Sequence, residues 1–203
     1  MAFSFPQRND EMSDAIREAT NQNILVFAGA SDRYHVGNPV GYPASDHNAI
    51  GVYPCRADGE PSTTVAREAE RNIMTLGDGV DAAFLEGQQR RFSGSSPATA
   101  ILAGVAGLLI TCSVIAPSLS ASVGQEYQRE QSLWMLLRTQ KGMEAILKNT
   151  MATQWASLER PKHYYVRPWF LFSTPREGQE TIHHLRTISR RILESLEAAV
   201  GTG

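Results

Sequence analysis

The chain has 203 residues, of which 42% are hydrophobic and 20% charged, and its formal net charge at pH 7 is −2. This length suits one domain with a sizeable core, and the balanced charge gives no global electrostatic reason to expect nucleic-acid binding. Three arginines (Arg186, Arg190 and Arg191) cluster on one expected helix. A solvated helix face is favoured for them over a nucleic-acid-binding patch.

The cysteines and the N-terminus bear on the cellular compartment. Cys55 and Cys112 lie far apart in sequence, without CxxC or Cys/His ligand spacing. We expect free thiols in a reducing compartment rather than a disulfide. The opening MAFSFPQRNDEM has no basic segment followed by an apolar stretch, so we predict no secretory signal. We therefore expect an intracellular, cytoplasmic location.

The first third of the chain has the pattern of an α/β repeat. Residues 10–20 carry apolar or small side chains at helical spacing, with Asn9 as N-cap. The run 23–30 (NILVFAGA) has the composition of a buried parallel strand. Because the opening MAFSFP looks like the end of a strand, we expect the chain to begin in the middle of a domain.

Turn residues dominate the stretch 31–62, in which only 49–53 looks like a strand. A further strand signal over 72–83 ends in glycines, and a long apolar run follows from Ser96 to a closing Pro117. Helices buried on all sides are apolar all round. A core helix is therefore favoured for this run over a membrane span, since flanking Lys and Arg anchors are absent.

The last third is predicted to be mainly helical. One long helix is expected over 125–148 and another over 176–200, with an extended aromatic stretch, YYVRPWFLF, at 164–172 between them. We therefore expect a single domain with a core over about 1–120 and a helical extension over about 125–203.

Three ordered motifs resemble one family. The segment SGSSPATAILAGVAGLL (93–109) resembles the nucleophile motif of subtilisin-like serine peptidases of the S8 type. ILVFAGASD (24–32) resembles the strand that ends in their oxyanion-hole asparagine, and VGYPA (40–44) their substrate-pocket loop. The segments 72–84, 136–147 and 167–172 resemble intracellular fungal members most closely. The resemblance covers only the C-terminal part of a complete subtilase domain.

The resemblance implies a fold, an activity and site residues. The implied fold is α/β, the C-terminal portion of a three-layer parallel-sheet domain, and the implied activity is serine endopeptidase through an acyl-enzyme. Ser96 matches the nucleophile and Asp32 the oxyanion-hole position; a capping role at a helix start is the alternative for Ser96. The implied substrate-binding residues are Gly29, Ala30, Ser31, Val40, Gly41, Tyr42, Pro43 and Ser95.

Two departures weaken the expected activity. The family's Asp and His motifs precede the part matched here, and none of the five histidines (His35, His47, His163, His183 and His184) has the family's context. Each is expected to be a surface residue, and no zinc site is expected. Asp32 stands where a hydrogen-bond donor is required, and loss of one such donor costs roughly two to three orders of magnitude in rate.

The resemblance thus implies a serine endopeptidase domain that acts on a peptide or protein substrate, and no cofactor, metal, nucleic acid or membrane partner is expected. A missing N-terminal half or further domains would be its natural partners. The isolated chain is expected to be impaired or inactive, and a catalytically dead binding or scaffold domain is the alternative.

Overall fold

The computed structural model describes residues 1–30, 40–62, 72–119, 124–155, 163–172 and 181–201, and every structural statement below concerns these ranges. Its main sheet has the strand order β1-β2-β3-β7-β6. β1 (Phe27–Gly29), β2 (Ile50–Cys55), β3 (Asn72–Leu76) and β7 (His163–Val166) run parallel, and β6 (Ala152–Trp155) pairs with β7 antiparallel. The predicted parallel α/β sheet is therefore confirmed.

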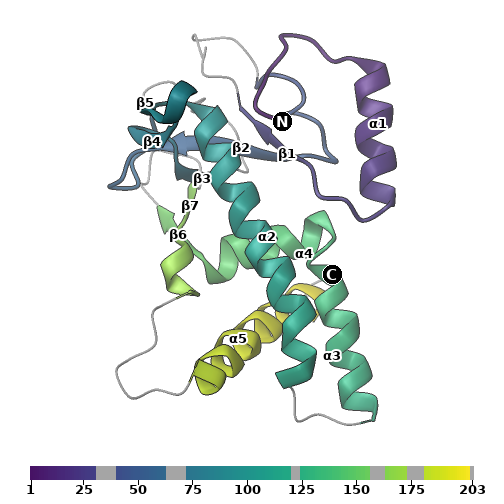
Figure 1. Ribbon diagram of the computed structural model, residues 1–203. Helices are drawn as coiled ribbons and strands as arrows, with labels where there is room; N and C mark the ends of the chain where they lie inside the picture. The colour runs from purple at the N-terminus through teal and green to yellow at the C-terminus, as the bar shows by residue number, and fades with distance from the viewer. Residues whose placement is uncertain (31–39, 63–71, 120–123, 156–162, 173–180, 202–203) are drawn as a thin grey trace.

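Helix α2 (Ser95–Leu119) crosses the molecule from the strands to a second layer of helices (Figure 1). It packs on β1, β2 and β3 near its start and against α3 (Gln125–Leu136) and α5 (Thr181–Gly201) further along. The sheet and the C-terminal helices are thus joined through one central helix.

Helix α1 (Asp10–Asn21) follows the predicted pattern closely. The Asn9 side chain accepts a 2.8 Å hydrogen bond from the Met12 backbone N–H, which satisfies one of the free donors of the first turn. Asp10 and Glu11 add negative charge at the positive end of the helix dipole. Ile16, 1% exposed, is the buried anchor of this helix.

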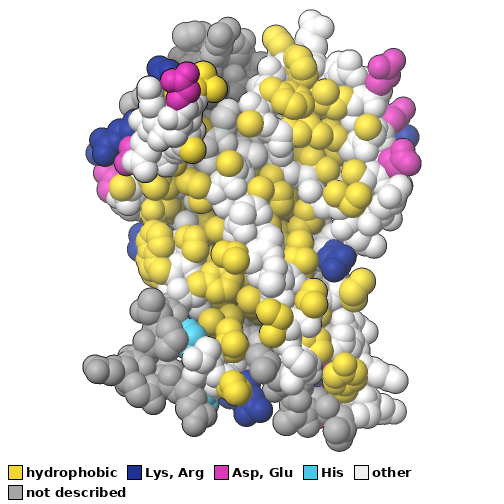
Figure 2. Space-filling view, viewed as in Figure 1, with side chains coloured by type: hydrophobic (Ala, Val, Ile, Leu, Met, Phe, Trp, Pro, Cys, Tyr) yellow, Lys and Arg dark blue, Asp and Glu magenta, His cyan; other side chains and the backbone are white. Residues whose placement is uncertain are grey.

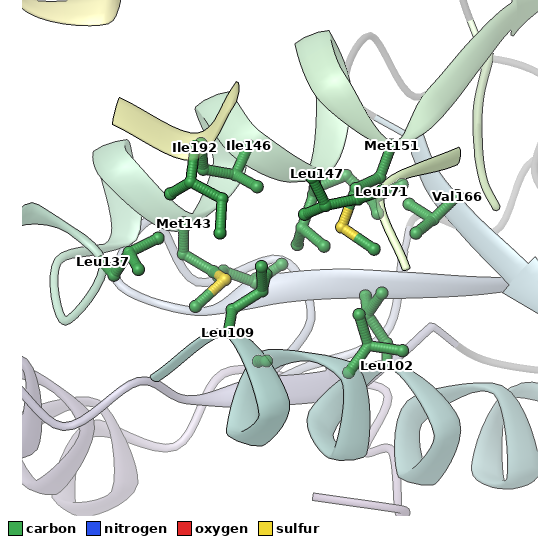
Figure 3. Packing of buried hydrophobic residues seen from close by; sticks show 14 of the residues in the cluster. Leu102, Leu109, Leu137, Met143, Ile146, Leu147, Met151, Val166, Leu171 and Ile192 are labelled. Carbon is green, nitrogen blue, oxygen red and sulfur yellow. The ribbon is translucent and has the colours of Figure 1, made fainter. Parts of the chain in front are cut away.

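The core lies between α2 and the C-terminal elements (Figure 3). Leu102 and Leu109 project from α2 towards side chains of the C-terminal part, all of which are fully buried. Burial of each such aliphatic side chain contributes about 1.5–3 kcal/mol. The labelled partners are Leu137, Met143, Ile146, Leu147, Met151, Val166, Leu171 and Ile192.

The single helix predicted over 125–148 is wrong, because the chain breaks at Thr139. Thr139 caps the short helix α4 (Gln140–Ala145) by accepting a hydrogen bond from the Gly142 N–H. A β-carbon on Gly142 would overlap the Leu136 carbonyl, so the sharp turn requires glycine there. A π-helical turn, Ile146–Thr150, follows directly.

Several strands and boundaries also differ from the predictions. β4 (Val80–Ala83) and β5 (Gln89–Phe92) form an antiparallel hairpin around a 3-10 turn at Leu85–Gly87, and β5 was not predicted. β6 and β7 join the main sheet, so the C-terminal part is more than a helical extension. A 3-10 turn, Pro168–Phe170, interrupts the aromatic stretch. Pro117 lies inside α2 rather than closing it.

The expectation that α2 is buried all round is also wrong. One face packs on the sheet, but the opposite face is exposed along the helix. By length and composition α2 is a candidate membrane span, with a third of its most apolar window buried. Its buried face belongs to the main core of the domain.

Candidate active site

Ser96 lies at the start of α2, at the carboxyl end of the parallel strands. It is half-buried, and its Oγ donates a 3.1 Å hydrogen bond to the Ala2 carbonyl oxygen. In open α/β sheets, ligands bind outside the carboxyl ends of the strands. The backbone N–H groups and the dipole of a helix N-terminus favour negative charge beside this serine.

Ser95 lies one residue earlier and is 5% exposed. It packs against Gly29 of β1, where an added β-carbon would lie 3.0 Å from Ser95 Oγ and 3.1 Å from Thr99 Oγ1. Thr99 Oγ1 donates to the Ser95 carbonyl oxygen at 2.7 Å. Of the two neighbouring serines, Ser95 is thus packed against the sheet while Ser96 is the more accessible.

The turn that leads into α2 is held by backbone contacts. Gly94 adopts a φ of +129°, a conformation that favours glycine. Its N–H donates to the Gly77 carbonyl oxygen at 2.7 Å. Ser93 Oγ also donates to Asp78 at 2.7 Å and accepts from the Gly79 N–H at 3.0 Å. The Ser93–Asp78 contact was not predicted, and no sequence pattern marks it.

The N-terminal segment, residues 1–5, lies beside this site. The Met1 amino group donates to the Phe27 carbonyl oxygen, and the Met1 carbonyl oxygen accepts from the Gly29 N–H at 3.0 Å. Phe5 forms an antiparallel bridge with Tyr42. The segment therefore lies along the edge strand β1 and bonds to it, but it forms only the isolated Phe5–Tyr42 bridge and no strand of its own.

The expected substrate residues fall into three groups. Gly29, the last residue of β1, and the following Ala30 are buried, and Gly29 packs against Ser95, the residue before Ser96. Residues 40–43 lie against the N-terminal segment, where a β-carbon on Gly41 would overlap the Ser4 side chain. Ser31 and Asp32 lie outside the described residues, so the geometry of the oxyanion position is not part of the structure.

Tyr42 points into the protein rather than towards a ligand. It is 3% exposed, and its hydroxyl donates to Asp46 at 3.2 Å. Ser13 Oγ donates to the same carboxylate oxygen at 2.8 Å, and the Asn48 N–H donates to the other at 3.0 Å. Burial acts to raise the pKa of Asp46, but these three hydrogen bonds hold it below its usual value. This network, which was not predicted, fastens α1 to the loop before β2.

The histidines do not supply a base for Ser96 within the described part of the chain. The hydrogen bond of Ser96 goes to Ala2, and no histidine bonds it there. His47 and His183 are exposed, as expected, but His163 and His184 are buried at 3% and 8% exposure, so the surface prediction is wrong for both. His163 begins β7, and His184 lies on the inner face of α5. A buried histidine takes the place of an apolar residue in such elements, so the spacing of apolar residues in the sequence did not reveal that these two are buried.

No group of three His, Cys, Asp or Glu side chains suited to a metal occurs among the described residues. A cavity of about 320 Å³ lies at the opposite, amino-terminal end of β2 and β3. Its lining includes Asp46, His47, Gln140 and Glu144 but neither serine of the α2 start. This cavity is therefore separate from the Ser96 site.

Comparisons with known proteins give one sequence relative and several fold relatives. No protein-family model matches the chain. A subtilisin-like protease of Podospora anserina, het-Q2, is 37% identical over 103 residues, which is 47% of this chain and 28% of that protein. Among solved structures, the PatG macrocyclase domain superposes with a TM-score of 0.60 at 17% identity, over 85% of this chain and 51% of that one. The prenylagaramide maturation protease PagA gives 0.58 at 18% identity, over 90% and 58%.

The parallel sheet with its central helix therefore has the subtilisin-like fold, and about half of the sequence is similar to a subtilisin-like protease. The chain spans 28% of the curated relative that it matches and about half the length of the solved structures.

Proposed function

We propose that this chain is the Ser96-bearing part of a serine endopeptidase domain of the subtilase class. The observation that carries the proposal is the position of Ser96. Its hydroxyl lies at the half-exposed N-terminus of α2, on a glycine turn, beside the ends of the parallel strands. This is the position that the family resemblance assigns to the nucleophile.

The chemistry would proceed through an acyl-enzyme. Ser96 Oγ attacks the carbonyl carbon of a peptide, its proton passes to a base, and the same proton protonates the departing amine. The positive end of the α2 dipole and the N–H groups of its first turn favour the developing oxyanion. A neutral serine hydroxyl is a weak nucleophile without that base.

The isolated chain is proposed to be impaired. Within the described residues Ser96 has no histidine partner, and by the resemblance Asp32 replaces the neutral oxyanion donor. A missing donor alone lowers kcat by roughly 10²–10³. Both features equally suit a second candidate function, a catalytically dead domain that binds peptide or protein segments.

An activity-based fluorophosphonate probe separates the two functions. The probe is expected to label the wild-type chain slowly, with the label mapped to Ser96 by peptide mass spectrometry and lost in Ser96→Ala. Ser118→Ala, at the exposed far end of the same helix, is the matched control and should keep the label. Labelling that survives Ser96→Ala would discard the nucleophile assignment. Absence of label under all conditions favours the binding domain.

A further inference from the structure

The cavity at the amino-terminal end of β2 and β3 is a polar site that the proposed peptidase chemistry does not use. Its volume of about 320 Å³ falls at the lower end of the range for small-molecule pockets. Its walls come from the loop before β2, from β2 and β3, and from α4. Ser45 and His47 of the lining are exposed, so the cavity is open to solvent.

The charge of this cavity distinguishes it from the surface around α2. Figure 2 shows a broad apolar face with charged side chains mostly at its margins. No Asp, Glu, Lys or Arg occurs between Phe92 and Glu126, the stretch that contains α2. The cavity instead gathers two carboxylates, an amide, two hydroxyls and an imidazole. A charged ligand therefore finds complementary groups in the cavity and none along α2.

Glu144 brings to the cavity a carboxylate with unused acceptor capacity. Its Oε1 accepts a 2.9 Å hydrogen bond from Gln140 Nε2, and its Oε2 pairs with Lys148. A carboxylate offers about four acceptor sites, so these contacts leave others for a ligand. Gln140 Nε2 also donates to the Ala49 carbonyl oxygen at 3.4 Å, so both of its hydrogens are used and its Oε1 remains an acceptor.

Asp46 contributes negative charge rather than a direct contact. Its side chain is 3% exposed, and its oxygens already accept hydrogen bonds from Ser13, Tyr42 and Asn48. Lys148 offsets only one of the two carboxylates, and the lining contains neither Lys nor Arg among the residues that the structure describes. The wall thus has a net negative charge, which attracts a cation and repels an anion.

Tyr53 is an independent sign that a ligand belongs in the cavity. It is 5% exposed and forms part of the wall, yet its hydroxyl has no hydrogen-bond partner among the described residues. Buried polar side-chain atoms are normally paired. Burial raises the pKa of Tyr53 to about 12, so the hydroxyl stays protonated at neutral pH and keeps its lone pairs for an N–H donor.

We propose that this cavity binds an organic cation, a guanidinium or primary ammonium group, through Glu144, Gln140 and Tyr53. The N–H groups of the ligand donate to the Glu144 carboxylate, to Gln140 Oε1 and to the Tyr53 hydroxyl. The Tyr53 ring adds a cation–π surface. The volume suits one arginine-like group rather than a folded segment. The site lies apart from Ser96, so it stands or falls independently of the peptidase activity.

Agmatine is the probe, because it carries a guanidinium and an ammonium group on a short chain. It is titrated at pH 8 into the ¹⁵N-labelled 203-residue chain and followed by two-dimensional NMR. We expect one-to-one binding with a Kd below about 1 mM. The backbone amides of Ser45 and Gly51 and the side-chain amide of Gln140 should shift. N-propylurea, a neutral analogue, should bind at least about tenfold more weakly.

Two variants test the ligand contacts. Glu144→Gln removes the charge and should lower the agmatine affinity at least about tenfold. Tyr53→Phe should lower it about threefold or more, while the free energy of unfolding in urea stays equal or rises, since the lost hydroxyl has no partner in the free protein. A merely structural hydroxyl would instead lower stability. Glu126→Gln, at an exposed position of α3 outside the cavity, is the matched control and should change the affinity less than about twofold.

A peptide identifies the source of the cation. Tighter binding of acetyl-Gly-Arg-Gly-amide than of agmatine assigns the cavity to an arginine side chain, and weaker binding assigns it to a free small molecule; both support the proposal. Equal affinity for N-propylurea, or unchanged agmatine affinity in both Glu144→Gln and Tyr53→Phe, overturns it. Ca²⁺ that produces the same shifts at a lower Kd assigns the cavity to a metal ion and also overturns it, as does the absence of saturable binding by agmatine and the peptide.

Discussion

Ser93 donates a 2.7 Å hydrogen bond to the Asp78 carboxylate and thereby ties the turn after β3 to the turn that precedes Ser96. The two residues are fifteen positions apart, with the whole β4–β5 hairpin between them. The hairpin thus closes on a polar contact placed three residues before the proposed nucleophile.

Removal of this contact should lower the labelling rate at Ser96 several-fold while reducing the free energy of unfolding only slightly. Because both side chains are exposed, Ser93→Ala should cost about 0.5–1.5 kcal/mol in the free energy of unfolding, measured by urea denaturation. The rate of fluorophosphonate labelling at Ser96 should fall several-fold. The single variant Asp78→Asn keeps an acceptor oxygen for Ser93 and should retain most of the wild-type labelling rate. Equal rates in wild type, Ser93→Ala and Asp78→Asn would contradict a positioning role.

Replacement of glycine by alanine should change the free energy of unfolding in opposite directions at Gly29 and Gly104. Gly29→Ala places a methyl group 3.0 Å from Ser95 Oγ in a buried site, so we expect a loss of about 1–3 kcal/mol. Gly104→Ala adds a methyl group where nothing lies within 4 Å, and better helix propensity should raise stability by up to about 1 kcal/mol. Thermal and urea unfolding measure both, and a stabilising Gly29→Ala would show that α2 is packed less closely on β1.

Asp46 should make the stability dependent on pH in the acid range. Its folded-state pKa lies below the usual value of about 3.9, so the carboxylate contributes stability above that pH, and the contribution is lost as the pH falls through the folded pKa. Asp46→Asn should cost about 1.5–3 kcal/mol at pH 7. The difference from wild type should shrink below about pH 4.

The control for this pH effect is Asp14→Asn. Asp14 pairs with Arg17 on the surface of α1, with its side chain 66% exposed. Surface pairs of this kind contribute at most about 1 kcal/mol. Urea titrations at a series of pH values that give the same pH profile for both variants would refute the role of the buried network.

The two thiols should differ in reactivity. Burial, with the Asp58 charge as a smaller cause, raises the pKa of Cys55 to about 12, and its side chain is fully buried. Since the thiolate is the reactive form, Cys55 should react with Ellman's reagent at pH 8 only through unfolding. Cys112 is partly exposed, although burial raises its pKa as well, and it should react first. The fast phase should disappear in Cys112→Ala.

The elements that local patterns define were predictable. Asn9 with its acidic neighbours marked the start of α1, and the β-branched runs marked β1 and β2. The break at Thr139 was not predictable from periodicity, because apolar side chains continue at helical spacing on both sides of it. The helix ends there because Thr139 caps α4 and Gly142 closely approaches Leu136.

The candidate site was predicted in part. The family motifs singled out Ser96 and Gly29, which the structure brings to one end of the sheet. The contacts of these residues depend on tertiary structure: no sequence signal joins Ser96 to Ala2, or Ser13 to Asp46 across 33 positions. Composition alone also could not separate a helix buried all round from one with a single uncovered apolar face, because both are uniformly apolar.

The 25 residues of α2 give it a length of about 38 Å at 1.5 Å per residue. One end holds Ser96, and the other is held by packing against α3 and α5. A helix fixed at both ends moves as a stiff rod, so the position of the serine hydroxyl depends on contacts formed far from it. Loss of anchoring at Ile192 of α5 would therefore broaden the positional spread of Ser96 without any change to its immediate neighbours. The C-terminal helices thus help to fix the position of Ser96, the proposed nucleophile, from the far end of α2.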